Sequence, residues 1–207
     1  KKTKRNTKNI AVKKIIFFSQ NKHKILEIQK LFKNTKINIV GLELFSEIKA
    51  PRENGSTFKE NAKIKSDYCF KKTKKPCFAD DSGICISALG DLPGIKSKRF
   101  IKKFGGYKKT FKKIINEIKK KLNNKAYFYT CIALTLNAKK TVFFEGKIYG
   151  TISKIPKGEY GFDYDPIFIP KGFKKTFAEM TPRQKNKISH RSIATIKLKK
   201  YLLRFYK

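Results

Sequence analysis

The segment from Phe128 to Leu136 constrains the fold most, because it is apolar or small at almost every position. Its side chains alternate between two sets that could both pack against apolar layers, as in a strand covered on both faces. Asn137 to Lys140 then provides a turn, and Thr141 to Phe144 returns as a second apolar run. We therefore expect an antiparallel hairpin that needs other parts of the chain to cover its faces.

Helical patterns before and after this hairpin can supply that cover. Four helices are predicted, from apolar residues at three-to-four spacing or from the capping-box residues Thr57 and Glu60. They are Ile25–Phe32, Thr57–Lys74, Tyr107–Leu122 and Ser189–Phe205. Further short strands are expected at Ile15–Phe18, Ile37–Leu42, Pro76–Ala79, Ile148–Ile152 and Pro166–Ile169. Because α/β units are mixed with an antiparallel hairpin, we expect an α/β protein with a mixed, strongly twisted sheet flanked by helices.

The chain is strongly basic, and two interpretations of this charge remain open. Its 51 Lys and Arg against 15 Asp and Glu give a formal net charge of +36, which would suit a nucleic-acid-binding protein that contacts phosphates. Alternatively, an A/T-rich genome biases codons toward Lys, Asn, Ile and Phe, and the lysines only solvate the surface. The second interpretation is favoured, because the lysines are scattered along the whole chain.

Other residue types narrow the class of protein further. The four cysteines show no C-x-x-C spacing, and with only two histidines a zinc site is not expected. We expect reduced thiols in a cytoplasmic protein. No apolar run approaches the ~20 residues that cross a membrane. Residues 1–13 are expected to be a basic, disordered tail, and residues 14–207 a single domain.

Because acids are scarce, the places where they cluster are informative. Asp80 and Asp81 are adjacent after a predicted strand and are followed by Ser82 and Gly83. Two neighbouring carboxylates repel each other unless a cation lies nearby, so they suit a hard divalent metal ion and a general base. A polar turn closed by Gly83 is the competing interpretation.

Three other polar segments could form parts of a ligand site. Ser19 to Lys24 lies between a strand and a helix, where backbone N–H groups could hold phosphates; a plain helix cap is the alternative. Phe162 precedes a strand and could stack on a planar base, or it could simply anchor its loop. Ser189-His190-Arg191 begins the last helix, with ordinary capping by Ser189 as the competing view.

Taken together and in this order, the motifs resemble the inosine triphosphate pyrophosphatase family. The residues that carry the resemblance are Ser19-x-Asn21-x-x-Lys24, Glu53-Asn54-Gly55-x-Thr57-Phe58-x-Glu60-Asn61-Ala62-x-x-Lys65, Ala79-Asp80-Asp81-Ser82-Gly83, Pro93-Gly94-Ile95-x-Ser97-x-Arg99-Phe100, Gly161-Phe162-Asp163-Tyr164-Asp165-Pro166-Ile167-Phe168 and Thr181-x-x-x-Lys185-x-x-Ile188-Ser189-His190-Arg191. The resemblance spans nearly the whole chain from Ile15 to Leu202.

This resemblance implies a Mg²⁺-dependent hydrolase that splits noncanonical purine nucleoside triphosphates (ITP, dITP, XTP) into monophosphate and pyrophosphate. It implies an elongated, two-lobed fold with a central cleft, and a homodimer. By the same analogy Glu53, Asp80 and Asp81 hold Mg²⁺, and Asp81 accepts the proton of the attacking water. The implied substrate-binding residues are Ser19, Gln20, Asn21, Lys22, His23, Lys24, Lys65, Ser82, Phe162, Asp163, Tyr164, Asp165, Lys185, His190 and Arg191.

Three departures from the family pattern bear on substrate preference more than on the reaction. Ser19-Gln20 replaces a usual Thr-Gly, Asp163 replaces a usual Gly, and Asn54 replaces a Thr after the metal-binding Glu. Two alternatives to the enzyme remain: a nucleic-acid-binding protein that uses the lysine excess, and, on account of these departures, an inactive relative that binds nucleotides without hydrolysis.

Overall fold

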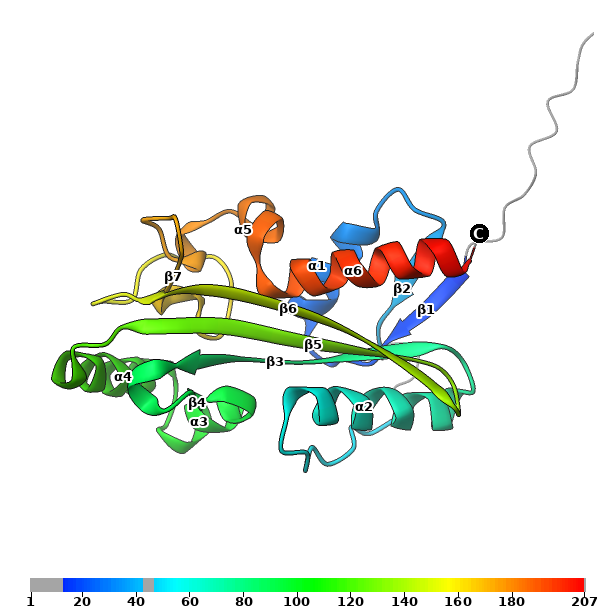
Figure 1. The fold of residues 1–207 in the computed structure, drawn as a ribbon, viewed down its shortest axis with the longest axis horizontal. Helices are drawn as coiled ribbons and strands as arrows, with labels where there is room; N and C mark the ends of the chain where they lie inside the picture. The colour runs from blue at the N-terminus through cyan, green and yellow to red at the C-terminus, as the bar shows by residue number, and fades with distance from the viewer. Residues whose placement is uncertain (1–12, 43–46, 207) are drawn as a thin grey trace, which may run out of the picture.

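The computed structural model describes residues 13–42 and 47–206, which form one mixed sheet with helices on both faces (Figure 1). The strands are β1 (Lys13–Phe17), β2 (Ile37–Val40), β3 (Cys77–Ile86), β4 (Leu92–Pro93), β5 (Lys125–Asn137), β6 (Lys140–Ile152) and β7 (Phe168–Pro170). Their order is β2-β1-β3-β5-β6-β7, and β4 pairs with β3 beside this path. β1 is parallel to β2 and β3, and β5 is antiparallel to both of its neighbours, which confirms the expected mixed sheet.

Residues 1–12, nearly all of the expected basic tail, lie outside the described residues, and Lys13 already belongs to β1. Within the described ranges, no helix combines the length and the apolar character needed to cross a membrane.

The hairpin predicted from the alternating segment is confirmed, and it is longer than expected. β5 and β6 each span 13 residues and stay paired from Lys125 opposite Thr151 to Asn137 opposite Lys140. The two short strands expected on the returning arm are therefore one strand. Gly146 allows the last helix to approach this strand closely, because a Cβ there would lie 2.0 Å from the carbonyl oxygen of His190.

The helices cover the two faces of this sheet. They are α1 (Lys22–Phe32), α2 (Phe58–Thr73), α3 (Ser97–Lys103), α4 (Tyr107–Lys121), α5 (Pro182–Ile188) and α6 (His190–Phe205). In Figure 1, α2 lies along one face and α1 and α6 along the other, while α3 and α4 lie toward the opposite end of the molecule. All four predicted helices are present.

Two short helices, α3 and α5, were not predicted as helices. Each has only seven residues, too few for the apolar repeat to show. For α5 the sequence does carry a local signal. Thr181 and Gln184 form a capping box around Pro182 at the first helical turn, the pattern that favours a helix start.

The apolar core of the described residues comprises four clusters, and the two largest lie toward the two ends of the sheet, as expected for two lobes. One cluster centres on Phe17, Phe32, Phe78, Ile132 and Leu198, beneath α1 and α6. The other is built around Ile86, Ile114, Phe128, Phe168 and Phe177, between α4, β7 and the segment before α5. β3 and β5 contribute to both clusters, so the long strands connect the two lobes.

The sheet is open at one place between the lobes. β1 pairs with β3 at Cys77 and Phe78, and β4 pairs with β3 at Cys85 and Ile86. Between these pairings β3 has no strand on that side among the described residues, and Asp80 and Asp81 lie in this interval. The strand was expected to end at Ala79, but it continues because β5 pairs with it throughout, Asp80 opposite Ile132 and Asp81 opposite Cys131.

The cap of α2 gives a test of the fold. The Thr57 side chain accepts a hydrogen bond from the Glu60 N–H at 3.1 Å, so Thr57→Ala leaves that donor without its partner. We expect the free energy of unfolding to fall by about 1 kcal/mol, measured by urea denaturation. Thr57→Ser is the matched control and should retain most of the stability; equal losses in both variants would contradict the capping role.

Candidate active site

A cleft of about 1000 Å³ lies beside the open interval of β3. It is bounded by the residues that follow β1, by residues 50–53 before α2, and by α3. Twelve of the residues predicted for the site line it: Ser19, Gln20, Asn21, Lys24, Glu53, Lys65, Asp80, Asp81, Ser82, Asp163, Tyr164 and His190. The structure thus brings together segments far apart in the sequence. Lys22, His23, Phe162, Asp165, Lys185 and Arg191 are not among the lining residues.

The two adjacent carboxylates do not face each other. They occupy consecutive positions of β3, and consecutive side chains of a strand point to opposite faces of the sheet. Asp80 therefore contacts α1 and α6, whereas Asp81 contacts α2. Because the two side chains point to opposite faces of the sheet, the expected repulsion between them is reduced. Each carboxylate instead lies near its own cation, Lys24 for Asp80 and Lys65 for Asp81.

Asp81 lies in a polar pocket formed by α2. Its Oδ2 accepts a hydrogen bond from Asn61 at 3.1 Å, and its Oδ1 lies 3.9 Å from the ammonium of Lys65. Burial raises the pKa of Asp81 to about 6, with the charge of Glu53 adding to the effect and Lys65 opposing it. The carboxylate is therefore ionised at neutral pH but remains basic enough to take up a proton.

Lys65 connects the carboxylates on this side of the cleft. Its ammonium lies 3.0 Å from the Glu53 carboxylate and donates a hydrogen bond to the backbone carbonyl oxygen of Asp80 at 2.6 Å. Burial alone would lower the pKa of Lys65, but Asp81, Asp80 and Glu53 outweigh it and raise that pKa above its ordinary value. Lys65 is thus a fixed positive charge.

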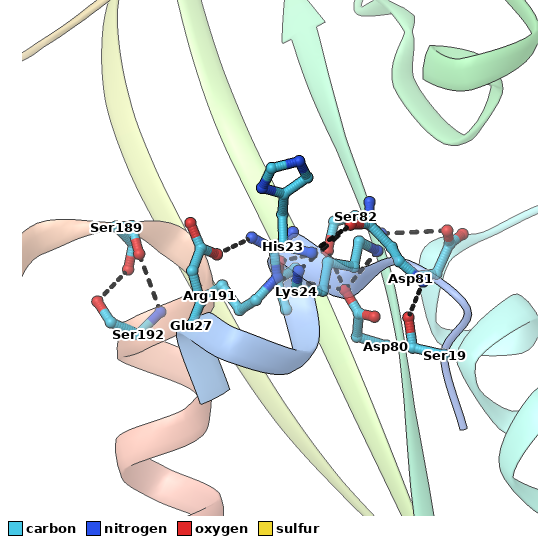
Figure 2. A network of polar contacts seen from close by, with 12 residues as sticks. Ser19, His23, Lys24, Glu27, Asp80, Asp81, Ser82, Ser189, Arg191 and Ser192 are labelled. Atoms are coloured by element: carbon cyan, nitrogen blue, oxygen red, sulfur yellow. Dashed lines mark hydrogen bonds and ion pairs between the residues drawn. The ribbon is translucent and has the colours of Figure 1, made fainter. Parts of the chain in front are cut away.

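Asp80 is held on the other face by cations (Figure 2). Its Oδ2 lies 2.7 Å from the Lys24 ammonium and 3.6 Å from Arg191 Nε, and it accepts the Ser82 hydroxyl at 2.6 Å. Burial opposes ionisation, but the charges of Lys24, Arg191 and Lys65 prevail and hold the pKa of Asp80 well below its usual range. Asp80 is a permanent anion in this site.

The residues at the start of α1 cap the helix, as one of the two interpretations predicted, and they also line the cleft. Asn21 Oδ1 accepts the backbone N–H groups of His23 at 3.0 Å and Lys24 at 3.3 Å, and Ser19 Oγ accepts the Asn21 N–H at 3.2 Å. Ser19, Gln20 and Asn21 line the cleft as well. Capping and a place in the cleft are therefore compatible.

Glu27 belongs to this cluster and was missed from the sequence. Its carboxylate lies 2.5 Å from Arg191 (Figure 2). It also lies 3.0 Å from Lys185, which in turn lies 2.6 Å from Asp165. The charges of Arg191 and Lys185 outweigh burial and lower the pKa of Glu27. The only local hint in the sequence is that Glu27 is one of few acids in the chain and lies one helical turn after Lys24.

The loop expected to frame a base is anchored next to these cations. The Phe162 ring stacks on His23 with centroids 5.2 Å apart, and the Lys185 ammonium lies 4.4 Å from its centroid. Asp165 accepts the Phe162 N–H at 2.8 Å, and the Tyr164 hydroxyl donates to the Ser97 carbonyl at 2.8 Å. The loop is thereby fixed to α1, α3 and α5 together.

Asp163 stands in this loop with φ at 55°, in the left-handed region where Gly is usual. Its carboxylate accepts the Tyr107 hydroxyl at 3.0 Å. The Asp that replaces the usual Gly of the family at this position therefore has a hydrogen-bond partner in Tyr107.

His190 lines the cleft from the first turn of α6. Its ring stacks on Phe128 with centroids 4.6 Å apart and planes 6° apart, and its Nδ1 is buried without a hydrogen-bond partner among the described residues. Burial, reinforced by Arg191, Lys185 and Lys24, lowers the pKa of His190 well below its ordinary value. The imidazole is therefore neutral and has an unused polar atom.

The three predicted metal ligands are only partly grouped. Glu53 and Asp81 face the same Lys65 ammonium, whereas Asp80 faces α1 and α6. Within residues 13–42 and 47–206, no three His, Cys, Asp or Glu side chains form a cluster that could hold a metal ion. The carboxylate oxygens of Glu53 and Asp81 are nevertheless of the type that Mg²⁺ prefers.

Asp81 allows a test of this electrostatic description. Its carboxyl pKa is higher in the folded state than the ordinary value of 3.8, so its charge costs stability above the folded pKa of about 6 and costs none below 3.8. Asp81→Asn removes the charge and can keep the Asn61 hydrogen bond. We expect the variant to be more stable than the native protein at pH 8, by on the order of 1–3 kcal/mol, with the difference shrinking steadily as the pH falls from 6 toward 3.8.

Urea denaturation between pH 4 and pH 8 measures this difference. An Asn variant that is less stable than the native protein at pH 8 would show that the surrounding cations compensate the Asp81 charge fully.

Comparisons with known proteins agree with these features. A model of the Ham1 family matches residues 15–201. A dITP/XTP pyrophosphatase of Porphyromonas gingivalis is 38% identical over 193 residues, covering 93% of this chain and 98% of the relative. A dITP/XTP pyrophosphatase of Bacillus subtilis is 36% identical over 195 residues, with 93% and 98% covered.

Solved structures give the same result for the fold. A HAM1 protein from Coxiella burnetii has a TM-score of 0.83 at 34% identity, covering 93% of this chain and 99% of that one. The Ham1 protein of Staphylococcus aureus has a TM-score of 0.79 at 34% identity, covering 94% and 100%. The resemblance drawn from the sequence motifs is confirmed.

Proposed function

Because this chain belongs to the Ham1 family, we propose that it hydrolyses noncanonical purine nucleoside triphosphates such as dITP, XTP and ITP to the monophosphate and pyrophosphate. The observation that carries the proposal is Asp81, a carboxylate with a pKa raised to about 6, in an open cleft with Lys65 and Glu53 beside it. Hydrolysis of a phosphoanhydride needs a proton acceptor for water and positive charge for the phosphates, and this site has both.

In this proposal Asp81 takes the proton of the attacking water. Lys24 and Lys65 bind phosphate oxygens from the two sides of β3, and the carboxylates that hold them keep both ammonium groups fixed before substrate enters. Positive charge that is already in place costs no reorganisation during the reaction. Ser82, whose hydroxyl contacts Asp80 and Thr130, is positioned by the same strand.

Magnesium is proposed as the cofactor, because the donors present suit a hard cation. Glu53 and Asp81 would hold it, and the assignment of Asp80 as a third ligand stays a prediction. When bound, Mg²⁺ would neutralise charge on the phosphate chain.

Recognition of the base is proposed to use the cluster at the start of α6. Arg191 and Lys185 are donors held by Glu27 and Asp165, and neutral His190 has a free ring nitrogen. Donors facing the 6-keto oxygen of a purine would be left unpaired by adenine, which carries an amino group there. This supports discrimination against ATP.

A cytoplasmic homodimer is proposed as the working form. All four cysteines are free and buried, which suits a reducing compartment. The dimer is proposed on the family resemblance.

The substrate panel decides the function. Pyrophosphate release from ITP, dITP, XTP, GTP and ATP should be fastest for the first three nucleotides and should require Mg²⁺. Nucleotide binding without pyrophosphate release would instead identify an inactive relative. Release from ATP as fast as from ITP would contradict the proposed role of the α6 cluster.

The role of Asp81 is tested by Asp81→Asn. Loss of the general base should lower kcat for ITP by roughly 10²–10⁴-fold, measured at saturating Mg²⁺. Asp91→Asn is the matched control, since Asp91 is an exposed carboxylate that does not line the cleft and accepts the Tyr127 hydroxyl. An Asp81→Asn variant with near-native turnover would exclude this residue as the base.

A further inference from the structure

The positive charge of the chain is concentrated at the end of the molecule that contains α4. Residues 97–125 include twelve Lys or Arg but a single acid, Glu117. Almost a third of the net charge of +36 therefore comes from about a seventh of the chain. Lysines are scattered along the whole sequence, and what distinguishes this stretch is the scarcity of acids among them. In Figure 1, α4 lies at one end of the molecule, apart from α1, α2 and α6.

The lysines of α4 gather on one side of the helix. This side, which we call the basic face, consists of the exposed residues Lys109, Lys112, Lys113, Asn116, Lys119 and Lys120. They recur at three- and four-residue spacing, which places side chains on the same side of an α-helix, and with Glu117 they line one hollow of about 570 Å³. Phe111, Ile114 and Ile115 occupy the opposite side and are buried in the core.

The basic face is separate from the cleft and has little negative charge to balance it. None of the lysines of α4 lines the cleft. The Glu117 carboxylate lies 3.3 Å from the Lys120 ammonium. Among the described residues, no other ion pair includes a lysine of the basic face.

This arrangement destabilises the helix that carries it. Lys108 and Lys112 are four residues apart, as are Lys109 and Lys113, and like charges at this spacing repel. The first turn of α4 contains no acid, and its N-cap residue, Gly106, offers no side chain to accept a hydrogen bond. Lys108 and Lys109 therefore lie beside the positive end of the helix dipole without compensation. A bound polyanion would relieve both kinds of repulsion.

A nucleic acid suits the basic face better than a membrane or a protein does. A helix that lies in a membrane surface inserts apolar side chains, and α4 buries its own in the core. A protein interface usually has an apolar centre, which the basic face lacks. A phosphate backbone needs only closely spaced cations.

The length of the basic face also fits a phosphate backbone. From Lys109 to Lys120 the helix axis runs for about 16 Å at the usual rise per residue. Duplex DNA carries one phosphate charge about every 1.7 Å of its axis, so several phosphates lie within reach of these flexible side chains.

From these observations we propose that the basic face of α4 binds the phosphate backbone of nucleic acids without reading their sequence. The ammonium groups contact phosphate oxygens and displace the counterions condensed on the nucleic acid. This binding goes beyond the proposed function and does not depend on it, because the basic face contributes no residue to the cleft.

The test measures binding of the full chain to a fluorescently labelled duplex DNA of mixed sequence, by anisotropy at several salt concentrations. Lys109→Gln/Lys112→Gln/Lys119→Gln removes three charges from the basic face and leaves the Glu117 partner, Lys120, in place. Gln and Lys have similar helix propensities, so α4 should remain helical.

A matched control removes the same number of charges elsewhere. Lys30→Gln/Lys33→Gln/Lys36→Gln changes three exposed lysines at the end of α1 and just after it, and none of them lines the cleft. Thermal melts verify that both variants are folded.

The dissociation constant for the duplex at low salt should rise about 10-fold or more in the basic-face variant and less than about 2-fold in the control. Each lost phosphate contact lowers the slope of log K against log salt by about 0.9, so the basic-face variant should lose roughly 2 to 3 from this slope. The control should lose almost none. Glu117→Gln removes the one acid of the hollow and should tighten binding. Both triple variants should keep the native kcat and KM for ITP.

Equal losses of affinity and of salt slope in the two triple variants would show a general charge effect and overturn the proposal. A native protein that does not bind the duplex would overturn it as well. So would binding to anionic phospholipid vesicles or to polyglutamate that is as tight as binding to DNA. If DNA binding follows the expected pattern while no nucleotide in the panel is hydrolysed, the basic face stands as a nucleic-acid surface and the proposed function fails.

Discussion

The continuous pairing of β3 with β5 is the constraint on which the rest of the site depends. It keeps the chain extended through Asp80 and Asp81, where two adjacent acids in a basic protein would otherwise favour a turn. Extension sends the two carboxylates to opposite faces of the sheet. Each then meets cations from a different layer, Lys24 and Arg191 on one side and Lys65 on the other. A single strand thus separates two electrostatic environments within one cleft.

These environments are unequal, and the difference is chemically useful. Three cations surround Asp80 and hold its pKa well below the usual range, so its carboxylate stays ionised. Asp81 is buried with weaker compensation, which leaves it readier to accept a proton. Neighbouring residues of one type therefore differ in proton affinity because of their surroundings alone, the pattern expected of a catalytic pair. The cost falls on stability, as is common where function needs a destabilised group.

Local sequence patterns predicted most of the helices and strands correctly, but many of the contacts in the site could not be predicted from them. The alternating run at Phe128–Leu136 and the capping residues Thr57 and Ser189 predicted their elements correctly, because these signals are complete within a few residues. The continuation of β3 through its acids depends on a partner strand some fifty residues later in the sequence, which no local window contains. Glu27 was missed for the same reason, since its importance comes from Lys185 and Arg191 at the far end of the chain.

The stacking of Phe162 on His23 has a consequence for how a base could enter. The Phe162 ring already has an aromatic partner, so a purine that took this position would exchange one stacked contact for another. Such an exchange yields little net free energy, and it yields nearly the same amount for every purine. Choice among purines then has to come from polar atoms at the edge of the ring. Stacking on Phe162 would therefore not distinguish one purine from another, and the charged residues beside it would determine which purine binds.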